Sequence, residues 1–195
     1  MPSMHSDSLT PEPIKIVVSG GFGVGKTTFV GAISEIEPLR TEAAMTEAAA
    51  AVDDRSMVST KTSTTVAMDF GRISVRDRLV LYLFGTPGQD RFSFMWDDLV
   101  TGALGAVILV DTRRIEDCFD ALDYFESRGV PFVVAINEFD GKLLHTPTEV
   151  RAALDLAGDI PVVTCDARNR GRVKAALLSV LEQALANAEQ QLVAG

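Results

Sequence analysis

The chain has 195 residues, of which 47% are hydrophobic and 23% charged, and its formal net charge at pH 7 is −9. This length and composition predict one globular domain whose core needs neither a metal ion nor a disulfide. The acidic balance argues against a nucleic-acid partner, because a phosphate-backbone site needs a basic surface. No apolar run reaches the roughly 18 residues of a membrane span. The two cysteines, Cys118 and Cys165, have no paired spacing; they are expected to be small core residues in a reduced cytoplasm.

The first third of the chain predicts a strand and a helix around a glycine-rich turn. Residues 1–13 contain three prolines and few apolar residues, so we expect a flexible N-terminal tail. The apolar stretch Ile14–Val18 predicts a strand, and a helix is expected from Lys26 to about Ile36. Residues 39–63 are weakly patterned, and the sequence leaves open whether they form a loose helix or an irregular excursion.

The rest of the chain alternates between expected strands and helices. Strands are expected at residues 66–75, 79–84, 104–110, 130–136 and 161–165, and helices at 115–128, from 146 and at 172–188. Thr146, Pro147 and Glu149 form a helix-start pattern in which Glu149 reaches back to the cap. The alternation predicts an α/β fold with a mostly parallel, doubly wound sheet of about six strands and helices on both faces. Such sheets bind their ligands at the carboxyl ends of the strands.

Residues 20–27, Gly-Gly-Phe-Gly-Val-Gly-Lys-Thr, complete the phosphate-loop pattern G-x-x-x-x-G-K-[ST] between the first strand and the first helix. The glycines let main-chain N–H groups point inward, and the N-terminus of the following helix favours negative charge. Lys26 adds a positive charge, and the hydroxyl of Thr27 is placed to ligate Mg²⁺ beside the β-phosphate. The pattern therefore predicts a nucleoside triphosphate site formed by Gly20, Gly23, Val24, Gly25, Lys26, Thr27 and Thr28.

Three segments together carry a family resemblance: the phosphate loop, residues 137–140, and residues 84–92, Phe-Gly-Thr-Pro-Gly-Gln-Asp-Arg-Phe. The chain resembles a Ras-like small GTPase over residues 14–188, which would make this range a G domain between tails at 1–13 and 189–195. The closer match is the bacterial branch that works with roadblock-domain proteins, in particular the GTPases of actinobacterial conservon operons. MglA-like GTPases are more distant. The resemblance implies a P-loop NTPase fold that binds GTP or GDP with Mg²⁺.

The expected base-recognition segment is Asn137-Glu138-Phe139-Asp140, which ends an apolar strand and resembles the guanine motif N-K-x-D. By resemblance, Asn137 braces the phosphate loop, and Asp140 accepts hydrogen bonds from the N1–H and 2-amino groups of guanine. Adenine offers neither donor in that arrangement and would leave the carboxylate unpaired. Glu138 stands where the family has a lysine whose stem covers one face of the base. We therefore expect guanine specificity without very tight binding.

Asp166-Ala167-Arg168 follows the last expected strand and resembles the S-A-K loop of the family. By resemblance, Ala167 donates its N–H to the guanine oxygen, and Arg168 covers part of the ring. Judged alone, the segment is equally well an ordinary turn between a strand and a helix.

Two further segments resemble the switches of the family. The register to Asp69-Phe70 favours Thr65 as the threonine that ligates Mg²⁺ and senses the γ-phosphate, with Thr64 as an alternative. In the second switch, Gly88 matches the glycine whose N–H meets the γ-phosphate, and Gln89 matches the glutamine that positions the attacking water. The expected catalytic residues are Lys26, Gly88 and Gln89, and the expected metal ligands are Thr27 and Thr65.

The larger departure from the family lies just after the strand expected at residues 79–84. The family pattern there is D-x-x-G, and Gly85 occupies the place of the aspartate that holds Mg²⁺ through a water. We expect Thr27, Thr65 and waters to hold Mg²⁺, more weakly than is usual, and intrinsic hydrolysis to be slow. Loop arginines are mostly solvated, so no cis arginine finger is assigned among Arg40, Arg55 and Arg91.

The resemblance implies a GTP-hydrolysing molecular switch that signals to a roadblock-domain regulator and, through it, to a sensor-kinase complex. The sequence shows no signal peptide or lipidation motif, so we expect a cytoplasmic protein without a direct membrane anchor, any membrane association arising through partners. The alternative is a nucleotide-loaded scaffold with little or no hydrolysis, which Gly85 and Glu138 favour. A P-loop kinase is a third class, but the sequence has no clear arginine-rich lid, and this class leaves residues 137–140 unexplained.

Overall fold

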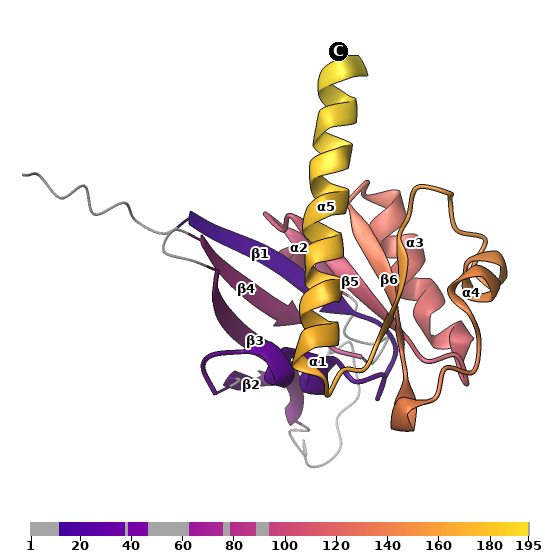
Figure 1. The fold of residues 1–195 in the computed structure, drawn as a ribbon. Coiled ribbons are helices and arrows are strands. Elements are labelled where there is room, and N and C mark those ends of the chain that lie inside the picture. Colours follow the sequence, from indigo (N-terminus) through magenta and orange to yellow (C-terminus); the bar gives the residue numbers. More distant parts are fainter. Residues whose placement is uncertain (1–11, 38, 47–62, 76–78, 89–93, 195) are drawn as a thin grey trace, which may run out of the picture.

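The computed structural model describes residues 12–37, 39–46, 63–75, 79–88 and 94–194. Their strands form one sheet in the order β2-β3-β4-β1-β5-β6-β7 (Figure 1). The strands are β1 (Glu12–Ser19), β2 (Leu39–Thr46), β3 (Ser63–Val75), β4 (Leu79–Gly85), β5 (Gly105–Val110), β6 (Phe132–Asn137) and β7 (Val162–Cys165). The helices are α1 (Lys26–Ile33), α2 (Trp96–Val100), α3 (Phe119–Ser127), α4 (Pro147–Ala153) and α5 (Arg170–Ala194), with short 3₁₀ turns η3 (Ile115–Cys118) and η4 (Phe139–Gly141).

The sheet is mostly parallel and has an antiparallel edge. β1 runs parallel to β4 and β5, and β6 runs parallel to β5 and β7. β3 runs antiparallel to both β4 and β2. This confirms the predicted doubly wound α/β fold, and β2 brings the described sheet to seven strands where about six were expected.

The sheet buries both of its faces under helices. Successive side chains of β1 point to opposite faces, so that Ile16 and Val18 join the cluster under α1 and α5 while Val17 joins the cluster under α2, α3 and α4 (Figure 1). Every residue of β5 and β6 is buried, as expected for central parallel strands. Cys118 and Cys165 are buried and unpaired, as the sequence predicted.

Several boundaries differ from those expected. α1 ends at Ile33, and the hydroxyl of Ser34 then donates to the carbonyl of Ile36 and accepts from the N–H of Arg72. Residues 115–118 form the 3₁₀ turn η3 before α3 begins. α5 extends through residues 189–194, which were expected to form a C-terminal tail. Of the segment left open at 39–63, residues 39–46 form β2, and 47–62 lie outside the described residues.

The predicted start of α4 is confirmed in detail. The N–H of Glu149 donates to the Thr146 hydroxyl, and the Glu149 carboxylate accepts from the N–H of Thr146 at 2.7 Å, so both halves of the capping box form. Among the helices of the described ranges, none combines the length and the apolar character needed to cross a membrane.

Candidate nucleotide site

The phosphate loop connects the carboxyl end of β1 to α1 in a conformation that needs its glycines. Gly20, Gly23 and Gly25 have φ angles of 127°, 72° and 109°, a region that residues with a Cβ rarely adopt. A Cβ added to Gly25 would lie 2.7 Å from the side-chain nitrogen of Asn137. The sequence therefore has glycine here both for backbone freedom and for a close approach to β6.

Lys26 is the buried charge of this loop. Its side chain is 8% exposed, and its ammonium donates hydrogen bonds of 2.7 Å to the carbonyls of Gly20 and Gly21. Burial lowers the pKa of Lys26 to about 8, and the nearby negative charge of Asp69 partly opposes that shift. The ammonium thus lies within the loop that the sequence predicts to hold phosphate.

Asn137 links three parts of the site. Its amide nitrogen donates to the carbonyl of Val24 at 2.8 Å, and its amide oxygen accepts from the N–H of Ala167 at 3.0 Å. Asn137 is only 7% exposed, so these bonds are shielded from water. The bracing of the phosphate loop that was expected of Asn137 is present. The N–H of Ala167, expected to bind the guanine oxygen, is here bonded to Asn137, so that role would require the bond to be shared or released.

Half of the predicted nucleotide-binding residues line one pocket of about 160 Å³. From the predicted set, this pocket is lined by Gly23, Gly25, Thr28, Asn137, Ala167 and Arg168. Asp140 lies in an adjoining pocket of about 130 Å³, and Asn137 and Phe139 line both pockets. The carboxyl ends of β1, β6 and β7 therefore meet at one place, as the sheet order requires.

Asp140 is exposed and held in a turn. Its φ is 56°, its side chain is 86% exposed, and its carboxylate lies 3.6 Å from the guanidinium of Arg168. Arg168 also donates to Asp166 at 3.0 Å, which lowers the pKa of the Asp166 carboxyl. The guanidinium of Arg113 lies 4.0 Å from the centre of the Phe139 ring. Two arginines thus contact the segment that is expected to recognise the base.

Glu138 has a partner that sequence reasoning missed. Its carboxylate accepts from the guanidinium of Arg172 at 3.1 Å, and the same arginine nitrogen donates to the hydroxyl of Thr164. The Glu138 side chain is 12% exposed. The negative charge that replaces the family lysine is therefore balanced by the first turn of α5.

The predicted switch residues are placed unevenly. Gly88 lies so close to the phosphate loop that an added Cβ would be 2.7 Å from the nitrogen of Lys26. Thr65 lies in β3 opposite Ala44 of β2, a placement of its backbone alone. Gln89, together with the arginine-finger candidates Arg55 and Arg91, lies outside the described residues, and Arg40 is described only as backbone of β2.

Asp69 is a further polar residue at the candidate site, which from sequence served only as the reference for the register of Thr65. Its carboxylate oxygen Oδ2 accepts a hydrogen bond of 2.6 Å from the hydroxyl of Thr27. Asp69 belongs to β3, whereas the family places its metal-holding aspartate at the end of the strand that corresponds to β4. The signal that could have identified it is an acidic residue on the strand beside Gly85.

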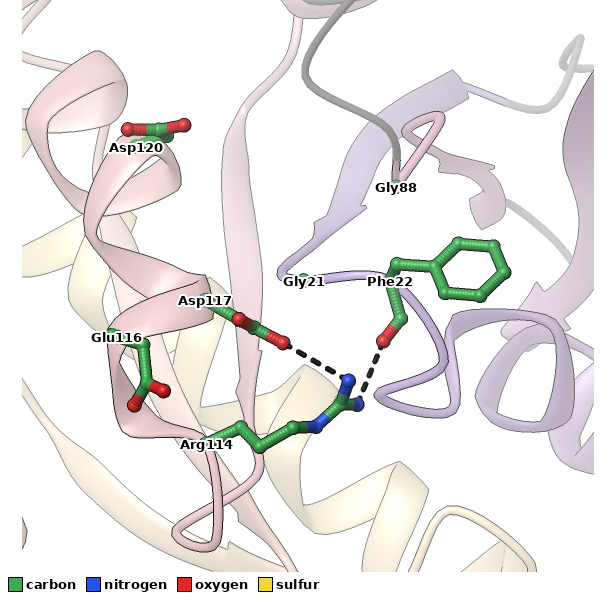
Figure 2. A pocket seen from close by; sticks show the side chains of 7 residues that line it. All are labelled: Gly21, Phe22, Gly88, Arg114, Glu116, Asp117 and Asp120. Atoms are coloured by element: carbon green, nitrogen blue, oxygen red, sulfur yellow. Dashed lines mark hydrogen bonds and ion pairs between the residues drawn. The ribbon is translucent and has the colours of Figure 1, made fainter.

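A larger pocket of about 470 Å³ lies on the η3 side of the phosphate loop (Figure 2). Its lining residues are Gly21, Phe22, Gly88, Arg114, Glu116, Asp117 and Asp120. The guanidinium of Arg114 donates to the carbonyl of Phe22 at 2.9 Å and lies 3.3 Å from the carboxylate of Asp117. Arg114 thereby ties the outer side of the phosphate loop to η3.

A phosphate loop after β1, braced by an asparagine at the end of β6 in a sheet of this order, defines a P-loop nucleotide-binding protein with a small-GTPase-like fold. The family described as "Conserved hypothetical ATP binding protein" matches residues 18–187, and the chain belongs to this family.

Related sequences include both an archaeal protein and eukaryotic Ras-related proteins. The chain is 28% identical to the uncharacterized protein MJ1339 of Methanocaldococcus jannaschii over 131 residues, which are 66% of this chain and 72% of that protein. It is 26% identical to the Ras-related protein Rab7 of Vigna aconitifolia over 196 residues, covering 91% of this chain and 85% of Rab7.

Solved structures of similar fold include two from FeoB. The cytosolic domain of the T. maritima FeoB iron transporter in a GDP form matches with a TM-score of 0.62 and 16% identity, covering 89% of this chain and 64% of that one. The FeoB G-domain of Methanococcus jannaschii matches with a TM-score of 0.59 and 13% identity, covering 89% of this chain and 98% of that one. At these identities the likeness is one of fold.

Proposed function

We propose that this protein binds guanine nucleotides and works as a slowly hydrolysing molecular switch. The observation that carries the proposal is the pocket in which the phosphate loop meets the loops after β6 and β7. Asn137, at the end of β6, is hydrogen-bonded both to the phosphate loop and to the loop after β7. The Ras-related name of the Rab7 relatives and the GDP form of the FeoB domain point in the same direction.

The choice of guanine depends on Asp140. The family description names ATP, whereas a carboxylate three residues after Asn137 complements the two donors of guanine and has no such partner on adenine. Arg168 lies beside Asp140. When the Asp140 carboxylate accepts hydrogen bonds from guanine, the Arg168 side chain would lie next to the edge of the base. Titration calorimetry with GDP, GTP and ADP in the presence of Mg²⁺ tests this choice, and ADP binding as tight as GDP binding would contradict it.

Asp140→Asn should move the preference from guanine toward xanthine. A hydrogen bond to a charged group is worth about 1.5–3 kcal/mol, so GDP affinity should fall by at least about tenfold. Asp159→Asn, which removes an exposed carboxylate between α4 and β7, is the matched control and should leave both affinities unchanged. Competition titrations with GDP and xanthosine diphosphate measure the shift; an unchanged GDP affinity would show that the base is recognised elsewhere.

The proposed chemistry uses few residues of this chain. The phosphate loop and Lys26 hold the polyphosphate, Gly88 offers its N–H to the γ-phosphate, and Gln89 orients the attacking water. Bound Mg²⁺ would neutralise charge that develops between the β- and γ-phosphates, and Thr27 is the hydroxyl that fits it. GTP would order the segments that carry Thr65 and Gly88, and hydrolysis would release them.

We propose that a roadblock-domain regulator binds these segments in a nucleotide-dependent way and passes the signal to a sensor-kinase complex. We also propose that this chain is cytoplasmic and associates with membranes only through such partners. The alternative is a nucleotide-loaded scaffold, which Gly85 favours because the usual metal-holding aspartate is absent from that position. Single-turnover GTP hydrolysis, measured with and without a roadblock-domain protein, separates the two. Acceleration by the partner supports the switch, and no turnover in either case supports the scaffold.

A further inference from the structure

The carboxylate of Asp69, on β3, lies next to Thr27, the last residue of the phosphate-loop pattern. Its Oδ2 lies 2.6 Å from the hydroxyl of Thr27, the residue of the phosphate-loop pattern whose hydroxyl is used for Mg²⁺. The next residue, Phe70, packs on Tyr82 and Phe84 of β4, with ring centres 5.8 and 5.1 Å apart. The strand that carries Asp69 is therefore fixed against β4 directly beside the site.

Gly85 and Asp69 are neighbours across the sheet. Phe70 pairs with Phe84 in the antiparallel register of β3 and β4, which sets Asp69 beside Gly85. A Cβ added to Gly85 would lie 3.1 Å from the Cβ of Asp69 and 3.3 Å from its Oδ2. These distances leave no comfortable room for a second carboxylate, so the glycine at position 85 makes space for the carboxylate of Asp69.

We propose that Asp69 supplies, from β3, the metal-holding carboxylate that small GTPases carry at the position of Gly85, and that it holds the nucleotide-bound Mg²⁺ together with Thr27. The proposal rests on the proposed function, because the metal arrives with the nucleotide. It differs from the expectation that Thr27, Thr65 and waters hold Mg²⁺. Mg²⁺ prefers oxygen ligands and is usually held by one or two carboxylates, substrate phosphates and waters, and a hydroxyl beside a carboxylate fits that preference.

Charge gives the proposal a direction that can be measured. A carboxylate beside Thr27 faces the negative charge of any polyphosphate held by the loop, and without a divalent cation the two repel each other. Asp69 should therefore oppose nucleotide binding when Mg²⁺ is removed and favour it when Mg²⁺ is present. A residue that only accepts a structural hydrogen bond from Thr27 would not show this change of sign.

The test compares the GDP affinity of the full chain in Mg²⁺ with that in EDTA, by titration calorimetry, for wild type and Asp69→Asn. The amide is similar in size to the carboxylate and can still accept from Thr27. In EDTA, we expect Asp69→Asn to bind GDP more tightly than wild type. The ratio of GDP affinity in Mg²⁺ to that in EDTA should be about 10–100-fold smaller in the variant than in wild type. Asp98→Asn, an exposed carboxylate on α2, is the matched control and should behave as wild type.

Two further measurements make the result independent of activity and folding. Electron paramagnetic resonance of Mn²⁺ with GDP should show weaker ion binding in Asp69→Asn. The double variant Asp69→Gly/Gly85→Asp, which moves the carboxylate to the usual strand, should regain the Mg²⁺ dependence that Asp69→Gly loses. An unchanged Mg²⁺-to-EDTA ratio in Asp69→Asn would overturn this inference alone. Wild-type protein that binds ADP as well as GDP would instead overturn the proposed function.

Discussion

Lys26 carries a positive charge where burial opposes it. Because its pKa is lowered to about 8, Lys26 is protonated less often in the free folded protein than in the unfolded chain between pH 8 and pH 10.5. Its own contribution to stability should therefore rise with pH in that range. Nucleotide binding should have the opposite dependence, since phosphate needs the protonated ammonium. The same residue therefore links the pH dependence of folding and of binding with opposite signs.

We predict that GDP affinity is flat near pH 7 and falls as pH rises through 8, approaching a tenfold loss per pH unit when one proton must be taken up. Calorimetry at pH 8.5 in two buffers of different ionisation enthalpy measures that proton uptake directly. The phosphate groups are already ionised at these values, because their last pKa is near 6. Equal heats in the two buffers would contradict the lowered pKa of Lys26.

Individual elements show what the sequence could and could not predict. The phosphate loop and the start of α4 were predictable because local chemistry specifies them: glycines with positive φ in the first, a capping box in the second. β2 was not, because residues 39–46 lack a regular alternation of apolar and polar residues and form a strand through their pairing with β3. The contact of Asp69 with Thr27 joins residues 42 positions apart, and only the cross-strand register reveals it.

The capping box of α4 gives a prediction at the scale of one element. Thr146→Ala removes the oxygen that accepts from the N–H of Glu149 and should destabilise the protein by about 1 kcal/mol. α4 lies away from the phosphate loop in the fold (Figure 1), so GDP affinity should not change. Thr146→Ser retains the cap and serves as the control. Urea unfolding monitored by circular dichroism measures the difference, and an equal loss in both variants would show that the hydroxyl bond is not the cause.

The whole molecule has helices on two faces of one sheet, and the candidate nucleotide site lies at the carboxyl ends of the strands. Arg172 of α5 is bonded to Glu138 after β6, and Arg114 before η3 is bonded to Phe22 of the phosphate loop. Arginines from segments that pack on opposite faces of the sheet, α5 and the turn before η3, thus contact the loops of the candidate site.

Trp96, the only tryptophan of the chain, lies at the start of α2, the helix that follows Gly88 in the sequence. Its ring packs edge-on against Tyr124 of α3 at 5.1 Å, and its N–H has no hydrogen-bond partner within the described residues. A contact between Gly88 and the γ-phosphate would pull on the start of α2 and change the surroundings of this ring. We therefore predict different tryptophan emission with GDP and with a non-hydrolysable GTP analogue. Lys26→Ala should abolish both responses, whereas identical spectra with both nucleotides bound at saturation would contradict a change at α2 that depends on the γ-phosphate.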